Sequence, residues 1–314
     1  MGTIKSGEVI KETISGRVMS TPPRTLSLAV LCFGVLAISF GSIFVRLCEA
    51  PSLIIAAYRL LIATLVLTPF QFSKPAAATE AERHDKSIYY LVAGVFLALH
   101  FATWVASLKY TSVASSVVLV STNPLFVALF SWWFLREGIS RRVMIGILVA
   151  VVGGILIAWT DVGMGHRTLK GDALALAGAM MMAGYLLTGR VIRQRTPLTQ
   201  YVFRVYAATA GVLLLICLVV EPNWVHYSGR TFLFFALSAL VPQSIGHTSL
   251  NWGLRHFPAA IVAVCTLLEP VGASLLALFL FREILTAERV LGGVIILVGI
   301  YLSIRESRPV KATS

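Results

Sequence analysis

The segment TSVASSVVLVSTNPLFVALFSWWFLREGISRRVMIGILVAVVGGILI (111–157) is repeated later in the chain as FPAAIVAVCTLLEPVGASLLALFLFREILTAERVLGGVIILVGIYL (257–302). Each copy has a polar residue followed by proline in mid-run, then an Arg-Glu pair, then spaced glycines. The matched positions are Asn123-Pro124 with Glu269-Pro270, Arg136-Glu137 with Arg282-Glu283, Gly146 with Gly292, and Gly153 with Gly299. Chance matches are common between apolar helices, but paired Arg, Glu and Pro are rare in them. We therefore interpret the two segments as a true internal repeat.

The composition is typical of a membrane protein. The 314 residues are 57% hydrophobic and 13% charged, whereas soluble domains carry about 25% charged residues. The mean hydropathy is +0.85. Apolar runs of about 20 residues have the length that a helix needs to cross the hydrocarbon layer. They predict an all-α integral membrane protein with ten transmembrane helices, at 26–47, 52–71, 87–108, 112–135, 141–160, 171–191, 198–220, 231–250, 258–281 and 285–304.

Ten spans divide into two repeats of five. We expect a cytoplasmic tail over 1–25, a first repeat over 26–160, a linker over 161–170, a second repeat over 171–304 and a cytoplasmic tail over 305–314. Because an odd number of spans separates the copies, they should lie upside down relative to each other. Inverted repeats with a helix breaker near mid-membrane are typical of secondary transporters.

The net charge of +12 is unevenly placed along the chain. With both termini in the cytoplasm, inside segments hold seventeen Lys and Arg residues and outside segments hold seven. Such a positive-inside bias orients a membrane protein. We therefore expect a multi-pass protein of a cell membrane, such as a bacterial inner membrane, whose basic residues face the lipid bilayer surface and do not bind nucleic acid.

The two quoted runs resemble the EamA family of the drug/metabolite transporter superfamily, and the resemblance extends over about 26–304. It implies a ten-helix bundle in which two inverted five-helix repeats surround a central cavity. It also implies a small-molecule substrate, because the family includes exporters of amino acids and other small metabolites. The aromatic-amino-acid exporters would fit a cavity rich in aromatic and Met residues. Nucleosides, sugars and drug-like compounds remain alternative substrates.

Two prolines predict kinks near the middle of their spans. Pro124 and Pro270 each remove a backbone donor and clash with the preceding turn, so freed carbonyls must find other partners. Asn123 and Glu269 precede these prolines and would either contact substrate or bond a loose carbonyl. A carboxylate in mid-membrane is costly and usually marks a pathway. We hypothesise that Glu269 carries a proton and couples transport to a proton gradient.

Other polar residues in the spans are candidates for binding or gating. Arg59 and Arg204 are intramembrane cations at equivalent places in the repeats, which favours a structural role, while a substrate contact or pairing with Glu269 is the alternative. Gly41, with its serine neighbours, is a candidate flexible point. Polar stripes at helical spacing should face inward, with hydrogen bonding between packed helices as the alternative. The candidate cavity residues are His100, Thr103, Trp104, Asn123, Tyr185, Ser244, His247, Asn251 and Glu269.

These patterns favour a secondary carrier that moves a small amphipathic metabolite, with an amino acid as the leading class and export as the direction. The sequence has no nucleotide-binding motif and no residue cluster at metal-site spacing, so we expect neither an enzyme nor a cofactor or metal. A channel and an intramembrane enzyme are the weaker alternatives. Both a monomer and a homodimer are compatible with the sequence.

Overall fold

The structure of the protein is a computed structural model that describes residues 22–72, 80–107, 110–111, 116, 119–136, 138–159, 169–221, 224, 226–282 and 286–306. The expected N-terminal tail and linker lie almost wholly outside the described residues, as do Glu137, Glu283 and the end of the C-terminal tail.

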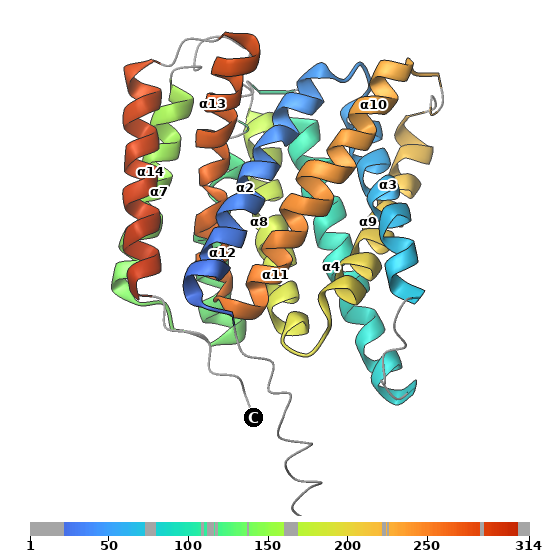
Figure 1. Ribbon diagram of the computed structural model, residues 1–314, viewed down its shortest axis with the longest axis horizontal. Helices are drawn as coiled ribbons and strands as arrows, with labels where there is room; N and C mark the ends of the chain where they lie inside the picture. The colour runs from blue at the N-terminus through green and yellow to red at the C-terminus, as the bar shows by residue number, and fades with distance from the viewer. Residues whose placement is uncertain are drawn as a thin grey trace, which may run out of the picture.

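The described residues form a bundle of helices that run side by side, and no strand occurs among them (Figure 1). The helices α7 and α14 form one flank, α3 and α9 lie at the other, and α2 and α8 lie between them. The elements are α2 (Arg24–Leu47), α3 (Ser52–Phe72), α4 (Glu80–Ser107), α6 (Asn123–Phe130), the π-helix η1 (Ser131–Leu135), α7 (Arg141–Trp159), α8 (Leu169–Arg193), α9 (Leu198–Val220), α10 (Gly229–Ser238), the π-helix η2 (Ala239–His247), α11 (Thr248–His256), α12 (Ala259–Thr266), α13 (Leu268–Phe281) and α14 (Ala287–Glu306).

The chain is a multi-pass membrane protein by the length and composition of its helices. Seven segments of the described chain are long and apolar enough to cross a membrane. The predicted boundaries agree with the structure to within two residues in α2, α3, α7, α8 and α9, and differences of one or two residues are common at helix ends. A hydrogen bond from the Arg24 guanidinium to the Ile304 carbonyl oxygen places the start of α2 and the end of α14 at the same end of the bundle.

Two predicted spans are interrupted in the structure, and a third contains a π-helix. The span at 258–281 is broken at Leu267 into α12 and α13, and the span at 112–135 contains a turn at Ser121 and Thr122 before α6 begins. The span at 231–250 is a longer run of helix, 229–256, whose middle third is the π-helix η2. The kinks expected at Pro124 and Pro270 are therefore helix breaks, and each proline lies in the first turn of the following helix, where its missing N–H costs nothing.

The glycines of the repeat pack α7 against α14. A Cβ on Gly153 would lie 2.6 Å from the Gly292 carbonyl oxygen, and a Cβ on Gly299 would lie 2.6 Å from that of Gly146. Small residues let helix backbones approach this closely in a membrane. Because the start of α7 contacts the end of α14, the two helices are antiparallel. Neither helix contributes a described residue to the central cavity.

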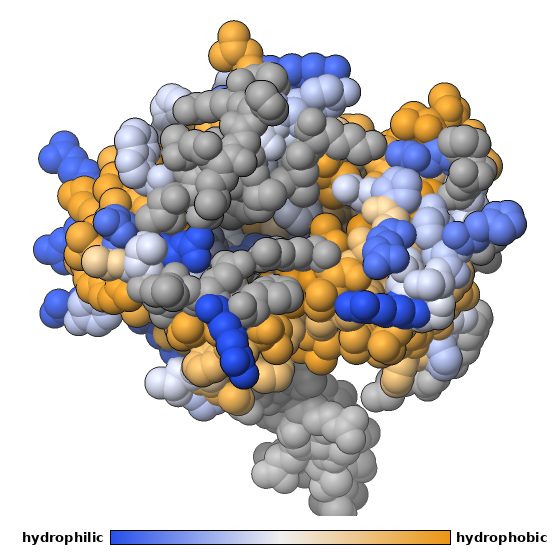
Figure 2. All heavy atoms as spheres, turned by 90° about the horizontal axis from the view of Figure 1, so that it is seen from above, coloured by the Kyte–Doolittle hydropathy of each residue, from blue (hydrophilic) through white to orange (hydrophobic). Residues whose placement is uncertain are grey.

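The outer surface of the bundle is strongly apolar. Large hydrophobic side chains that are more than half exposed occur on many of its helices, including Phe33, Leu65, Trp159, Leu218 and Phe279. Figure 2, which looks onto one end of the bundle, shows hydrophobic residues over broad areas between scattered hydrophilic ones. A soluble monomer rarely exposes large apolar areas, whereas a bilayer would cover them.

Candidate functional site

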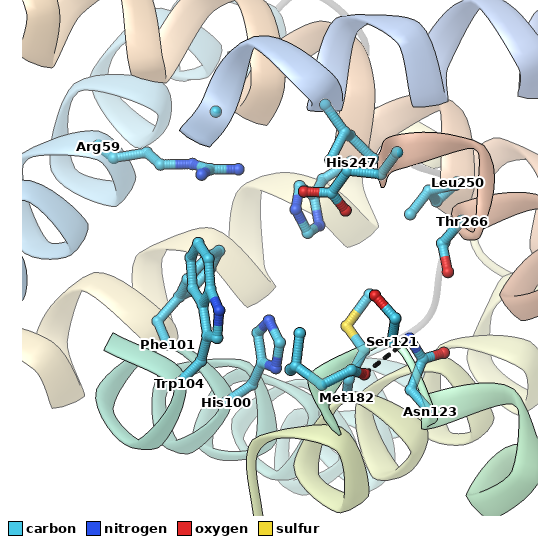
Figure 3. Close-up of a pocket in the computed structure, with 14 residues that line it drawn as sticks. Arg59, His100, Phe101, Trp104, Ser121, Asn123, Met182, His247, Leu250 and Thr266 are labelled. Carbon is cyan, nitrogen blue, oxygen red and sulfur yellow. Dashed lines mark hydrogen bonds between the residues drawn. The ribbon is translucent and has the colours of Figure 1, made fainter. Parts of the chain in front are cut away.

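A cavity of about 70 Å³ lies among the broken helices. It is smaller than the pockets of roughly 300–1,000 Å³ that bind drug-sized ligands, so a substrate larger than a few atoms requires the site to widen. Figure 3 draws the lining residues as sticks and labels ten of them. The described residues that line the cavity are Ile38, Gly41, Arg59, His100, Phe101, Trp104, Val120, Ser121, Asn123, Met182, His247, Leu250, Thr266 and Glu269.

Arg59 projects into the cavity from α3 (Figure 3). Its side chain is buried, its Nε donates a hydrogen bond of 2.8 Å to Gln243 Oε1, and its guanidinium lies 4.9 Å from the centre of the Phe101 ring. The amide and the ring face together fix a planar cation in one orientation. Gly41 of α2 lies beside the guanidinium, and a Cβ there would be 3.7 Å from one of its nitrogens, an ordinary contact distance.

Two histidines and a tryptophan form part of the wall. His100 Nδ1 donates a hydrogen bond of 2.9 Å to the Gly178 carbonyl oxygen on α8, and its ring is nearly parallel to that of Trp104, with centroids 6.2 Å apart. The His247 ring lies 5.8 Å from the Phe101 ring. The hydrogen bond to Gly178 fixes the tautomer of His100, so its other ring nitrogen is an acceptor while the ring is neutral.

Asn123 and Glu269, which occupy equivalent positions in the repeat, both line the cavity. Each lies in the first turn of a helix that follows a break, α6 and α13 respectively. Asn123 Nδ2 donates to the Val120 carbonyl oxygen at 3.3 Å, so the side-chain amide bonds the main chain at the helix break. The main chain of Glu269 is held by Ser39, whose Oγ donates to the Glu269 carbonyl oxygen at 3.2 Å.

Four residues on the cavity wall have buried polar atoms without a hydrogen-bond partner among the described residues. They are Arg59 (one terminal nitrogen), Trp104 (Nε1), Asn123 (Oδ1) and His247 (Nδ1). An unpaired buried polar atom costs about 1–3 kcal/mol, and native proteins contain few of them. Their concentration around one cavity indicates that a polar ligand or water completes the site.

Other predicted site residues are not among the described lining residues. The Tyr185 hydroxyl donates to Asn251 Oδ1 at 2.9 Å, and Asn251 Nδ2 donates to the His247 carbonyl oxygen at 2.9 Å, so the Tyr185–Asn251 pair ties α8 to α11 in the protein interior. Thr103 Oγ1 donates to the Leu99 carbonyl oxygen at 2.7 Å, and Ser244 Oγ to that of Ala239 at 2.7 Å. Both hydroxyls thus donate to backbone carbonyl oxygens of their own helices.

Arg204 differs from Arg59 although the repeat places them at equivalent positions. Its guanidinium lies 4.9 Å from the centre of the Tyr90 ring, and it is not a described lining residue of the cavity. Of these two arginines, the structure places only Arg59 among the described residues that line the cavity.

Several residues of the site were missed by sequence reasoning. Phe101, Met182, Leu250 and Thr266 line the cavity but carry no signal that separates them from ordinary packing residues. Gln243, which holds Arg59, had one signal in the sequence, because it is a polar amide inside a predicted span; the sequence did not indicate its partner.

Known proteins resemble this chain over most of its length. The EamA-like transporter family matches residues 25–159 and 169–305. An uncharacterized transporter of Archaeoglobus fulgidus is 24% identical over 286 residues, which are 89% of this chain and 97% of that protein. An uncharacterized transporter of Clostridium kluyveri is 25% identical over 202 residues, which are 62% of this chain and 64% of that protein.

A solved crystal structure shares the fold, with a TM-score of 0.75 at 17% sequence identity, and the match covers 90% of this chain and 97% of the other. The family match covers both halves of the sequence, and each half supplies residues to the cavity wall. The chain therefore belongs to the EamA-like transporter family and is a membrane transporter of that type.

Proposed function

We propose that the protein is a secondary carrier that exports small amphipathic metabolites, with amino acids as the favoured class, by alternating access. The observation that carries this proposal is the buried cavity with unpartnered polar atoms on Arg59, Trp104, Asn123 and His247. Apolar side chains such as Phe101 and Leu250 complete the wall. A wall of mixed polarity suits a solute that has both a charged or polar group and an apolar part.

The helix breaks support a carrier mechanism. In secondary transporters, binding sites near mid-membrane are commonly formed by discontinuous helices whose N-terminal ends carry unpaired backbone N–H groups. Here α6 and α13 begin at such breaks, and their first turns contribute Asn123 and Glu269 to the cavity. The same breaks provide places where the chain can bend as access alternates.

The packing of the helices supports the proposed arrangement of ten helices in two inverted five-helix repeats. The equivalent helices α3 and α9 pack against each other, as do α7 and α14. Exchanging the two repeats replaces Gly153 by Gly299 and Gly292 by Gly146. The contact between Gly153 and Gly292 therefore corresponds to the contact between Gly299 and Gly146. Arg136 and Arg282 are the only described residues other than glycine with positive φ, at 51° and 55°. A twofold relation between the halves would produce all three observations.

Glu269 is the group that we propose for proton coupling. Among the described residues its carboxylate forms no direct salt bridge or hydrogen bond, although it faces the same cavity as Arg59. A carboxylate that can be protonated beside the substrate would link substrate occupancy to proton movement.

Transport by proteoliposomes tests this function. Purified protein would be assayed with labelled amino acids, nucleosides and sugars, with and without a pH gradient. We expect saturable uptake of at least one amino acid with counterflow, which distinguishes a carrier from a channel. Uptake of no amino acid would contradict the substrate class, and flux without saturation or counterflow would contradict the carrier.

A matched pair of variants connects transport to the cavity. Ser121→Trp would place a large ring in the cavity and should reduce uptake to background. Leu218→Trp changes a side chain that is 68% exposed on the outer surface of α9 and should leave uptake within about twofold of the wild type. Equal uptake by both variants would show that the substrate takes another route.

A further inference from the structure

Some polar atoms around the cavity are hydrogen-bond donors and others are acceptors, and this mixture indicates the chemistry of the ligand. Arg59 and Trp104 present donors, through a guanidinium nitrogen and Nε1 that have no partner among the described residues. Asn123 presents an unpartnered acceptor, Oδ1, and Glu269 adds a carboxylate. The wall therefore offers both a cationic group with free donors and an anionic group with free acceptors.

The two charged groups are held apart. Arg59 interacts electrostatically with Glu269, but no salt bridge joins these two described residues, and Arg59 instead donates to Gln243 at 2.8 Å. The main chain of Gln243 is held in turn, because the Tyr206 hydroxyl donates to its backbone carbonyl oxygen at 3.3 Å. A buried cation and a buried carboxylate would normally pair directly. Here Gln243 and the Phe101 ring hold the guanidinium so that a terminal nitrogen remains available.

We propose that Arg59 and Glu269 are the two specificity-determining residues of a zwitterion site, in which Arg59 binds the carboxylate and Glu269 the ammonium group of an α-amino acid. Trp104 Nε1 donates a second hydrogen bond to the carboxylate, and Asn123 Oδ1 accepts one from the ammonium group. The side chain of the amino acid packs on the apolar part of the wall. This inference rests on the proposed function and assigns the recognition chemistry of the same site.

The charges of Arg59 and Glu269 favour a zwitterion over a singly charged ligand in this cavity. A zwitterion places one charge of each sign in the cavity and so leaves its net charge unchanged, whereas an isolated cation or anion would leave an unbalanced buried charge. Hydrogen bonds to charged groups are stronger than those between neutral groups, and a site built for such a group rejects an analogue that lacks it. Discrimination between the zwitterion and its singly charged analogues is therefore the property to measure.

The test is calorimetric titration of the purified full chain in detergent. Each of the twenty common amino acids is titrated first, and the tightest binder is compared with its carboxamide, which lacks the carboxylate, and its deaminated acid, which lacks the ammonium group. For the wild type we expect each analogue to bind at least tenfold more weakly than the parent. Arg59→Gln should reduce the preference over the carboxamide to less than about threefold, and Glu269→Gln should do the same for the deaminated acid.

Controls separate charge recognition from folding. Arg204→Gln removes the equivalent arginine of the other repeat, which lies at Tyr90 and away from the cavity, and should retain both preferences. Arg59→Lys keeps the positive charge and should retain a preference for the parent amino acid over its carboxamide. The wild-type comparison needs no variant, so it remains decisive if Arg59→Gln does not fold.

The possible failures are distinguishable. If an amino acid binds but its carboxamide or deaminated acid binds equally well to the wild type, the zwitterion site is overturned while amino-acid transport stands. If both preferences survive in Arg59→Gln and Glu269→Gln, other residues form the site. If no amino acid binds and proteoliposomes take up none, both this inference and the proposed substrate class are wrong.

Discussion

A methyl group on Gly153 would lie 2.6 Å from the carbonyl oxygen of Gly292, and a methyl group on Gly292 would lie 2.7 Å from the carbonyl oxygen of Gly153. These distances are shorter than van der Waals contact, and the obstructing atoms belong to the backbone. The two helices would therefore have to move apart to accept a larger residue at either position.

We accordingly predict that Gly153→Ala lowers the stability of the protein by about 1–3 kcal/mol, the usual cost of overpacking. The adjacent glycine is a matched control, because a Cβ on Gly154 would meet no atom within 4 Å. Gly154→Ala should be neutral or slightly stabilising. Thermal unfolding in detergent would compare the two variants, and equal apparent melting temperatures would contradict the proposed close contact.

Substitution of Trp104 should change substrate affinity, whereas substitution of Tyr185 should change stability. Trp104→Phe retains an aromatic ring beside His100 but removes the unpartnered Nε1 on the cavity wall. In the proposed site Nε1 donates to the substrate carboxylate, and a hydrogen bond to a charged group is worth about 1.5–3 kcal/mol, so we expect substrate affinity to fall by at least about tenfold with little change in stability.

Tyr185→Phe should have the opposite signature. Its hydroxyl is bonded to Asn251 inside the protein, and removal would leave a buried acceptor unpaired at a cost of about 1–3 kcal/mol. We expect a lower melting temperature with substrate affinity nearly unchanged. Trp159→Phe, which alters a ring that is 66% exposed, should change neither quantity. If Tyr185→Phe weakened binding as much as Trp104→Phe, the separation of the two roles would be wrong.

The sequence predicted those features that depend on the cost of burying polar groups in a membrane. Apolar run length predicted the helices, and the rarity of intramembrane carboxylates singled out Glu269, which lines the cavity. Pairing of Arg59 with an amide could not be predicted, because Gln243 is 184 residues away along the chain. The repeat also could not predict that these two arginines have different surroundings, since Arg59 faces the cavity and Arg204 lies at Tyr90.

The polar stripe of the eighth predicted span shows why periodicity has limits. We expected Ser244, His247 and Asn251 to share one face, which assumes 3.6 residues per turn throughout. Ser244 lies within the π-helix η2, where bonds connect residues five apart and each residue turns the helix through a smaller angle. His247 consequently lines the cavity while Ser244 bonds back to its own helix.

A further prediction concerns Arg193 and the contact between α8 and α11. Its side chain is 1% exposed, its Nε donates to the Asn251 carbonyl oxygen at 3.0 Å, and a terminal nitrogen donates to the Thr196 carbonyl oxygen. Hydrogen bonds from charged groups contribute about 1.5–3 kcal/mol each. Arg193→Ala should therefore lower stability by at least about 2 kcal/mol.

The control for this variant is Arg195→Ala, because the Arg195 side chain is exposed and surface charges contribute about 0–1 kcal/mol. Unfolding of both variants in detergent would be followed by circular dichroism. Similar melting temperatures for the two would show that the buried guanidinium does not hold α8 to α11.

Glu269→Gln tests coupling without a large change in shape, because glutamine has the size of glutamate but cannot bind or release a proton. If the carboxylate carries the coupled proton, the variant should lose the response of transport to a pH gradient, and net uptake driven by that gradient should fall at least tenfold. Exchange of substrate between the two sides, which needs no net proton movement, should fall less. Proteoliposomes with an imposed gradient would measure both quantities.

Glu288→Gln is the matched control, since Glu288 lies exposed in the first turn of α14. It should retain the response to the gradient. Unchanged transport and an unchanged pH profile in Glu269→Gln would exclude this carboxylate as the proton carrier. Loss of driven uptake together with equal loss of exchange would instead indicate that Glu269 acts in substrate binding alone, which is the outcome expected if its only partner is the ammonium group of the substrate.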